Sequence, residues 1–198
     1  MKFQPHVIFN CLHGYFGEDG QIQAILNYLG FPYTHSGVAT SSLLMNKIYS
    51  KKIFQSFGIQ TPKTLALDEL KNKFPLIVKP INGGSSNGLC KINNQKTLNK
   101  FVMDNQINLK NFMFEEFIPG RELTVGILEN KVCGVMEIEF SNEVYDYDNK
   151  YIDIAKHILD PQLPQDIHKK ITQSSLDIHN KLNCNSISRI DFRYDEKI

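Results

Sequence analysis

The chain of 198 residues is 41% hydrophobic and 22% charged, a composition typical of a soluble globular protein with one substantial core or two small ones. Its 22 basic and 21 acidic residues nearly cancel, which excludes the clustered positive charge of general nucleic-acid binding. No apolar run is long enough to span a bilayer, no signal-peptide pattern is present, and the four cysteines include no CxxC pair. We therefore expect a cytoplasmic protein with neither nucleic acid nor membrane as a partner.

The hydrophobic pattern predicts strands and helices in alternation over the first half of the chain. A strand at 6–10 precedes a helix that Asp19 caps and Gly30 ends. The other elements predicted before residue 106 are a helix from 41 or 42 to 57, a strand at 63–67, a short helix near 68, a strand at 74–79, its antiparallel partner at 88–92 and a helix at 97–105.

Strands dominate the second half of the chain. The predicted elements are strands at 111–117, 121–128, 131–140 and 186–195, a polar irregular segment at 141–153 and a helix at 164–182. His168 and His179 are expected on the polar side of that helix. The order of elements indicates a protein of the α/β class.

The stretch "FPLIVKPINGGSSNG" (74–88) ends a buried strand in a lysine and then opens into a glycine-rich loop. The backbone N–H groups of Gly83 to Gly88 can converge into an anion-binding nest, and Lys79 adds a positive charge at its base. The lysine precedes the glycines, so this is not a P-loop. From this stretch alone, a plain hairpin tip with an exposed lysine fits equally well.

Acidic residues mark the ends of two neighbouring predicted strands. Glu115 and Glu116 close one strand, and Glu122 opens the next after a break at Pro119 and Gly120. Carboxylates in such places can accept hydrogen bonds from an adenine amine and from ribose hydroxyls. Taken alone, the Glu115–Glu116 pair fits a solvated turn better.

The alternation in "SRIDFR" (188–193) places Arg189, Asp191 and Arg193 on one face of a strand. Arg189 can stabilise developing negative charge, and Asp191 can bind Mg²⁺. An exposed sheet face with charges that pair among themselves is the alternative. His13 follows the first strand, where ligand sites of α/β proteins collect, and the segment 145–151 suits a lid.

In this order the stretches resemble the D-alanine–D-alanine ligase family of the ATP-grasp superfamily. The motifs that carry the resemblance are "FNCLHGYFGEDG", "PYTHSGVATSSLLMNK", "FPLIVKPINGGSSNG", "EEFIPGRELTVGIL", "YDYDNKY" and "SRIDFR". The resemblance implies an ATP-grasp fold, in which two α+β subdomains hold ATP and pack on an N-terminal α/β domain. We expect a remnant of that domain at 1–40, a central subdomain at 41–118 and an incomplete C-terminal subdomain at 119–198.

The resemblance also implies a reaction. ATP, with Mg²⁺ or Mn²⁺, phosphorylates the carboxylate of one D-alanine, and the amine of a second D-alanine displaces the phosphate, for peptidoglycan synthesis in the cytoplasm. Intact members of the family usually form homodimers.

The roles that the resemblance assigns are tied to positions of this sequence. For ATP they are Lys47, Lys79 and Lys150 at the phosphates, Ser86 in the loop that closes over them, Glu115 with the backbone of Phe117 and Ile118 at the adenine, and Glu122 at the ribose. For the reaction they are Ser85 and Tyr151 in a hydrogen-bonded set near the first D-alanine, His13 in the substrate pocket, Arg189 at the oxyanion and Asp191 at the metal.

The sequence departs from the family pattern at three places. It has no leading strand with a substrate-binding glutamate, it has no Glu-x-Asn metal motif after the last strand, and Gly83 stands where an acidic residue is common. We therefore expect a chain truncated at both ends that is inactive by itself. The alternatives are a nucleotide-binding remnant without catalysis, another ATP-grasp carboxylate–amine ligase, and an α/β interaction module that binds no nucleotide.

Overall fold

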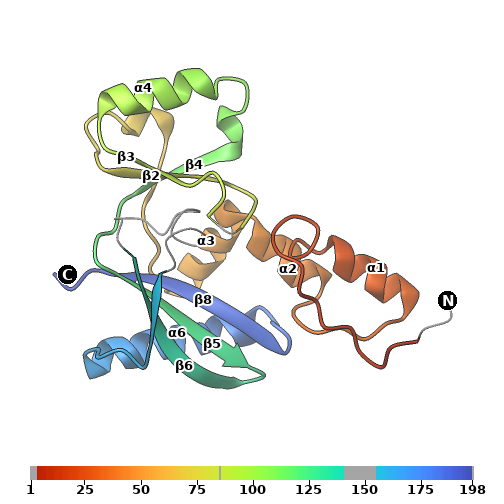
Figure 1. Cartoon of the computed structure of the whole chain (residues 1–198). Coiled ribbons are helices and arrows are strands. Elements are labelled where there is room, and N and C mark those ends of the chain that lie inside the picture. The colour runs from red at the N-terminus through yellow and green to blue at the C-terminus, as the bar shows by residue number, and fades with distance from the viewer. Residues whose placement is uncertain (1–3, 85, 141–154, 198) are drawn as a thin grey trace.

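The computed structural model describes residues 4–84, 86–140 and 155–197. Two four-stranded antiparallel sheets lie one above the other in Figure 1, each with a helix on its outer side, and a helical arm projects sideways near the N-terminus. The mixed α and β architecture predicted from the sequence is confirmed. No helix in the described ranges has both the length and the apolar character needed to cross a bilayer.

The first sheet, here called the central sheet, has the strand order β1-β4-β2-β3. Its strands are β1 (Thr64–Leu65), β2 (Leu76–Pro80), β3 (Cys90–Ile92) and β4 (Phe112–Glu116), with short 3₁₀ helices η1 (Leu67–Glu69) and η2 (Leu109–Asn111) between them. Helix α4 (Gln95–Asp104) covers one face, where Leu98 packs against Leu76, Val78 and Phe114. The helix predicted at 97–105 begins two residues earlier, and Asn94 caps it, because its side chain accepts the Thr97 N–H at 3.0 Å.

The second sheet, here called the C-terminal sheet, has the order β7-β6-β5-β8. Its strands are β5 (Arg121–Leu128), β6 (Lys131–Glu139), β7 (Lys156–Leu159) and β8 (Ile187–Tyr194), and α6 (Gln165–Lys181) covers one face. The side chains packed beneath α6 are apolar and alternate along the strands, as Leu123, Val125 and Ile127 do. The residues between them, including Glu122 and Thr124, therefore point to the opposite face.

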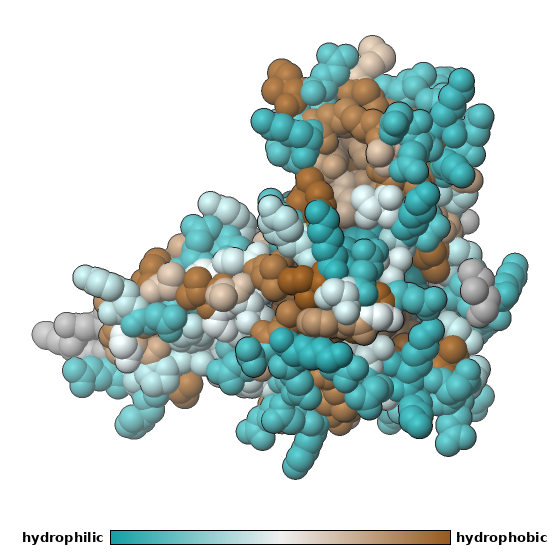
Figure 2. All heavy atoms as spheres, turned by 180° about the vertical axis from the view of Figure 1, so that it is seen from behind, coloured by the Kyte–Doolittle hydropathy of each residue, from teal (hydrophilic) through white to brown (hydrophobic). Residues whose placement is uncertain are grey.

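The arm contains α1 (Gln21–Leu29), and the predicted strand at 6–10 is reduced to one parallel bridge between Ile8 and Tyr33. Large apolar side chains of the arm are exposed, among them Phe9 beside the bridge and Tyr28 on α1. Hydrophobic groups accordingly reach the surface of the arm in Figure 2.

The single helix predicted from 41 or 42 to 57 is two helices, α2 (Val38–Met45) and α3 (Lys47–Ser56). The chain becomes extended at Asn46, whose side chain accepts the N–H groups of Ile48 and Tyr49, each at 3.1 Å. The break therefore starts a new, capped helix whose first residue is Lys47.

Two details of the C-terminal half were not predicted. Strand β7 pairs with β6 at the sheet edge, in a stretch of four residues too short to give a strand pattern. His179 is only 2% exposed, and its Nδ1 lies 2.8 Å from Ser188 Oγ, so the expectation of a solvent-facing histidine was wrong.

Candidate functional site

The glycine-rich loop between β2 and β3 is fastened to the start of α3. The Lys47 N–H donates to Ile81 O at 2.9 Å, and Lys47 Nζ donates to Gly83 O at 2.8 Å. Gly83 has a φ of 119°, which side-chain-bearing residues rarely adopt. The break at Asn46 thus brings a lysine and a loop of backbone amides to one place.

The turn that carries His13 lies beside the same loop. A Cβ built on Gly84 would lie 3.5 Å from Glu18 Oε2 and 3.8 Å from Gly14 Cα. His13 itself is exposed, next to Gly14. Two stretches separated by about seventy residues of sequence therefore meet.

Glu115 is the centre of a buried charge cluster. Its side chain is 3% exposed, and Lys79 Nζ lies 2.5 Å from Oε2. Lys51 Nζ bonds to Oε1 and also donates to Pro62 O at 2.5 Å. We call Lys47, Lys51, Lys79 and Glu115 the lysine cluster. Lys51 was not predicted, and its place one helical turn after Lys47 is the only signal in the sequence.

The lysine cluster holds more positive than negative charge. The pKa of Lys47 is lowered from 10.5 to about 8, mainly by burial and also by Lys79, while Glu115 acts in the opposite direction. Burial also lowers the pKa of Lys51 against the effect of Glu115. Three lysines share one carboxylate, so a polyanion bound here would relieve an existing repulsion.

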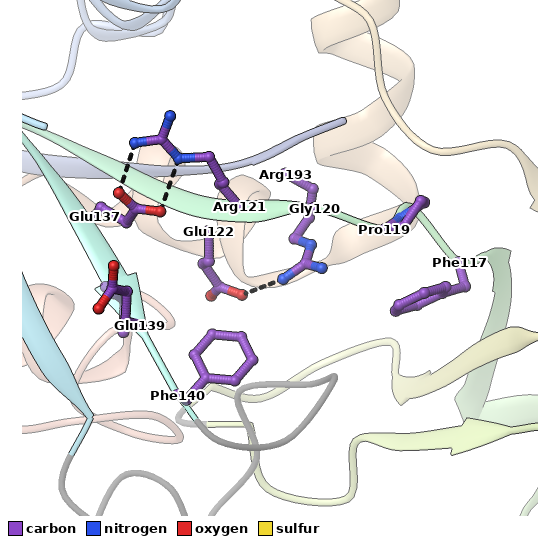
Figure 3. A pocket seen from close by; sticks show the side chains of 10 residues that line it. Phe117, Pro119, Gly120, Arg121, Glu122, Glu137, Glu139, Phe140 and Arg193 are labelled. Carbon is purple, nitrogen blue, oxygen red and sulfur yellow. Dashed lines mark hydrogen bonds and ion pairs between the residues drawn. The ribbon is translucent and has the colours of Figure 1, made fainter. Parts of the chain in front are cut away.

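A pocket of about 330 Å³ lies where the chain crosses from β4 to β5. Its lining includes Phe117, Glu122, Phe140 and Arg193. Arg121 and Glu137 also line it and pair with each other on the other side of β5 (Figure 3). Lys91 Nζ lies 3.9 Å from the centre of the Phe117 ring. The pocket thus combines aromatic surface with hydrogen-bonding groups, as small-ligand sites do.

Arg189 and Asp191 lie on the same face of the C-terminal sheet as Glu122. Arg189 Nε and Nη2 lie 3.1 and 3.2 Å from the Asp191 carboxylate oxygens, and Thr124 Oγ1 donates to Asp191 Oδ1 at 2.7 Å. The predicted alternation of charges on β8 is therefore confirmed, and so is their pairing. Arg189 is still 63% exposed and can meet a ligand.

The described residues do not by themselves form a Mg²⁺ or Mn²⁺ site. Asp191 supplies one carboxylate, which Arg189 and Thr124 already engage. Within the described ranges, no three His, Cys, Asp or Glu residues lie close enough to hold a metal ion.

Three predicted residues, Ser85, Lys150 and Tyr151, lie outside the described residues. Ser86 lies in the glycine-rich loop with a φ of 54°, and its carbonyl accepts the Leu89 N–H at 3.2 Å. Most of the other predicted residues form three groups: the lysine cluster, the pocket beside Phe117 with Ile118 in the adjoining segment, and the Arg189–Asp191 pair. His13 belongs to none of these groups and lies in the turn beside the glycine-rich loop.

A family model described as "D-ala D-ala ligase C-terminus" matches residues 37–198. The chain is 41% identical to a D-alanine–D-alanine ligase of Wolbachia pipientis wMel, over 99% of this chain and 65% of that protein. It is 44% identical to the D-alanine–D-alanine ligase of Pelagibacter ubique, over 98% of this chain and 67% of that protein. It also resembles the crystal structure of D-alanine–D-alanine ligase from Bacillus anthracis complexed with ATP, with a TM-score of 0.79 and 27% identity, over 98% of this chain and 65% of that one.

The chain thus spans about two thirds of the length of these relatives. The match to the family model, the identity to its members and the shared fold agree with the motifs found in the sequence. The chain has the ATP-grasp fold and belongs to the D-alanine–D-alanine ligase family.

Proposed function

We propose that these residues bind ATP between the two sheets and supply the nucleotide site of an enzyme that joins two D-alanines, a reaction that the chain by itself is not expected to complete. The observation that carries the proposal is the lysine cluster, with its surplus of positive charge, at the base of a glycine-rich loop. The loop and Lys47 lie on one side of Glu115, and the pocket beside Phe117 lies on the other along β4. The site therefore offers a cationic end and an aromatic, hydrogen-bonding end, as a nucleoside triphosphate requires.

The lysines and the loop would hold the phosphates. Lys47 Nζ and Lys79 Nζ now bond to Gly83 O and to Glu115, and both can extend to phosphate oxygens. The backbone N–H groups of the loop add donors that cost no side-chain entropy. Charge neutralisation and positioning are the main contributions that a protein makes to phosphoryl transfer.

The base and sugar would occupy the pocket. Glu115 would accept from the adenine amine, the backbone at Phe117 and Ile118 would flank the base, and Glu122 would accept from the ribose hydroxyls. A pocket of about 330 Å³ is of the right order for a base and a sugar.

The ligation would proceed in two steps, phosphorylation of a carboxylate and then displacement of the phosphate by an amine. The carboxylate oxygen of one D-alanine attacks the γ-phosphorus and ADP leaves. The amine of a second D-alanine then attacks the acyl carbon, phosphate leaves, and the amine loses a proton. Arg189 would stabilise the oxyanion of the tetrahedral intermediate, since its guanidinium is exposed while Asp191 fixes one edge. Mg²⁺ would accompany ATP, and among the described residues Asp191 would be its carboxylate ligand.

The domain boundaries, the compartment and the assembly belong to the same proposal. A boundary at 118 is supported by its position in the segment that joins β4 to β5, and so the two sheets. Cytoplasmic location and a homodimer are supported by the family resemblance.

The test is D-alanine-dependent release of phosphate from MgATP by the purified chain, with a Lys79→Met variant as the control. ATP binding without release is the result expected of a chain that supplies the nucleotide site but does not complete the reaction by itself. Release that needs both D-alanine and Lys79 would support the ligase reaction and contradict the expectation of an inactive chain. Absence of both would contradict the proposal.

A further inference from the structure

Arg193 reaches from β8 into the pocket beside Phe117 and contacts two groups there. Its Nε donates to Ile118 O at 3.1 Å, and its Nη1 lies 3.3 Å from Glu122 Oε2. Its guanidinium carbon lies 5.8 Å from the centre of the Phe117 ring. The contacts join the last strand of the C-terminal sheet to the segment that crosses between the sheets.

Arg193 and Glu122 are partly buried, with side chains 22% and 19% exposed. They sit opposite each other in the β5–β8 register, so the sheet itself fixes their separation. Because a charged hydrogen bond is stronger when water is partly excluded, this pair restricts the Glu122 carboxylate more than a surface ion pair does.

We propose that Arg193 is a positioning residue of the nucleotide pocket. It holds the Glu122 carboxylate in the orientation that accepts from the ribose hydroxyls, and its bond to Ile118 O keeps its own guanidinium beside that carboxylate. The inference rests on the proposed function, because it takes the occupant of the pocket to be a nucleotide. It assigns to Arg193 a role that the motif resemblance leaves open.

The geometry separates this role from ordinary sheet stabilisation. A residue that only stabilises the sheet affects every nucleotide equally once the chain is folded. A residue that acts through Glu122 affects nucleotides that carry ribose hydroxyls and spares those that lack them. The comparison of ATP with 2′,3′-dideoxyATP therefore distinguishes the two roles.

The experiment measures the affinity of the full chain for both nucleotides by isothermal titration calorimetry, with wild type, Arg193→Met and Arg193→Lys. We expect Arg193→Met to weaken ATP binding about tenfold, the loss of one charge-assisted hydrogen bond, and dideoxyATP binding less than about twofold. Arg193→Lys keeps the charge but not the two-pronged geometry, so we expect an intermediate loss for ATP.

Two further variants sharpen the result. In a Glu122→Gln background the Arg193→Met substitution should weaken ATP binding by less than about twofold, because its effect passes through Glu122. Lys156→Met is the control, since Lys156 forms an interstrand pair with Glu139 in the β6–β7 register, with Nζ 3.2 Å from Oε2, and is not among the residues that line the pocket. It should leave the affinity for ATP within about twofold of wild type.

The outcomes are distinct. Equal losses for ATP and dideoxyATP, or no loss with Arg193→Met, overturn the role of Arg193 while leaving ATP binding intact. If Arg193→Met does not fold, the Arg193→Lys comparison decides by the same criterion. Failure of the folded wild-type chain to bind ATP would overturn the proposed function, and this inference with it.

Discussion

Replacing Lys47 with methionine should stabilise the protein while weakening its binding of ATP. Methionine keeps most of the aliphatic stem and removes the cation. Lys47 is only partly exposed, and burial together with Lys79 lowers its pKa from 10.5 to about 8. The folded chain therefore holds this cation at a cost that a neutral side chain avoids.

The size of the effect follows from the pKa. A fall from 10.5 to about 8 makes the protonated lysine roughly 3 kcal/mol less favourable in the folded chain. Solvent screening at a partly exposed side chain reduces this figure. The variant also loses the bond from Nζ to Gly83 O, worth about 1 kcal/mol. We expect Lys47→Met to raise the free energy of unfolding by about 1 kcal/mol near neutral pH.

The sign of the pH dependence is fixed by the direction of the shift. Below pH 8 Lys47 is protonated in both the folded and the unfolded chain, and the folded chain bears the whole cost of the buried charge. Between about pH 8 and 10.5 the unfolded chain keeps the proton that the folded chain has released, so wild-type stability rises with pH relative to the variant. The stability that Lys47→Met gains over wild type should therefore disappear as the pH approaches 10.5.

The assay is urea denaturation followed by circular dichroism, at about pH 7 and about pH 10, with wild type, Lys47→Met and Lys52→Met. Lys52 is an exposed neighbour on α3 and serves as the control. A Lys47→Met variant that is less stable than wild type at both pH values would refute the account of Lys47 as a strained cation.

Three further predictions concern ionisable groups. Because a bound polyphosphate favours the charged form of Lys47, ATP binding near pH 8 should take up about half a proton more in wild type than in Lys47→Met, measured by calorimetry in buffers of different ionisation enthalpy. Glu115→Gln should destabilise the protein by about 3 to 5 kcal/mol in urea denaturation, since it leaves Lys51 and Lys79 without their buried counterion, and a loss below about 1 kcal/mol would contradict this. Burial lowers the pKa of His179, so wild-type stability should fall as the pH drops below the ordinary value of 6.5, and thermal melts of His179→Gln should show a weaker fall.

The local pattern of the sequence was sufficient to predict the β2–β3 hairpin and the alternating charges of β8. A lysine before a glycine-rich loop, and charges that alternate with apolar residues in β8, are short-range signals that depend on strand geometry alone. The structure has both, with Lys79 at the end of β2 and Asp191 beside Arg189.

The features that the sequence did not reveal depend on distant partners. Lys51 meets Glu115 across 64 residues of sequence, and the helix pattern around it gives no sign of a buried cation. The break at Asn46 is favoured by its capping bonds and by the fastening of Lys47 to the glycine-rich loop, which a continuous apolar pattern conceals. The segment 6–10 has a strand-like sequence, but in the described part of the chain it pairs at one position only, Ile8 with Tyr33.

The most direct test of the central claim is the affinity of the folded 198-residue chain for ATP, measured by isothermal titration calorimetry with wild type and Lys79→Met. The account predicts saturable binding at one site, weakened at least about tenfold when Lys79 loses its charge. Absence of saturable binding by the folded wild type, or equal affinity in the Lys79→Met variant, would contradict a nucleotide site built on the lysine cluster.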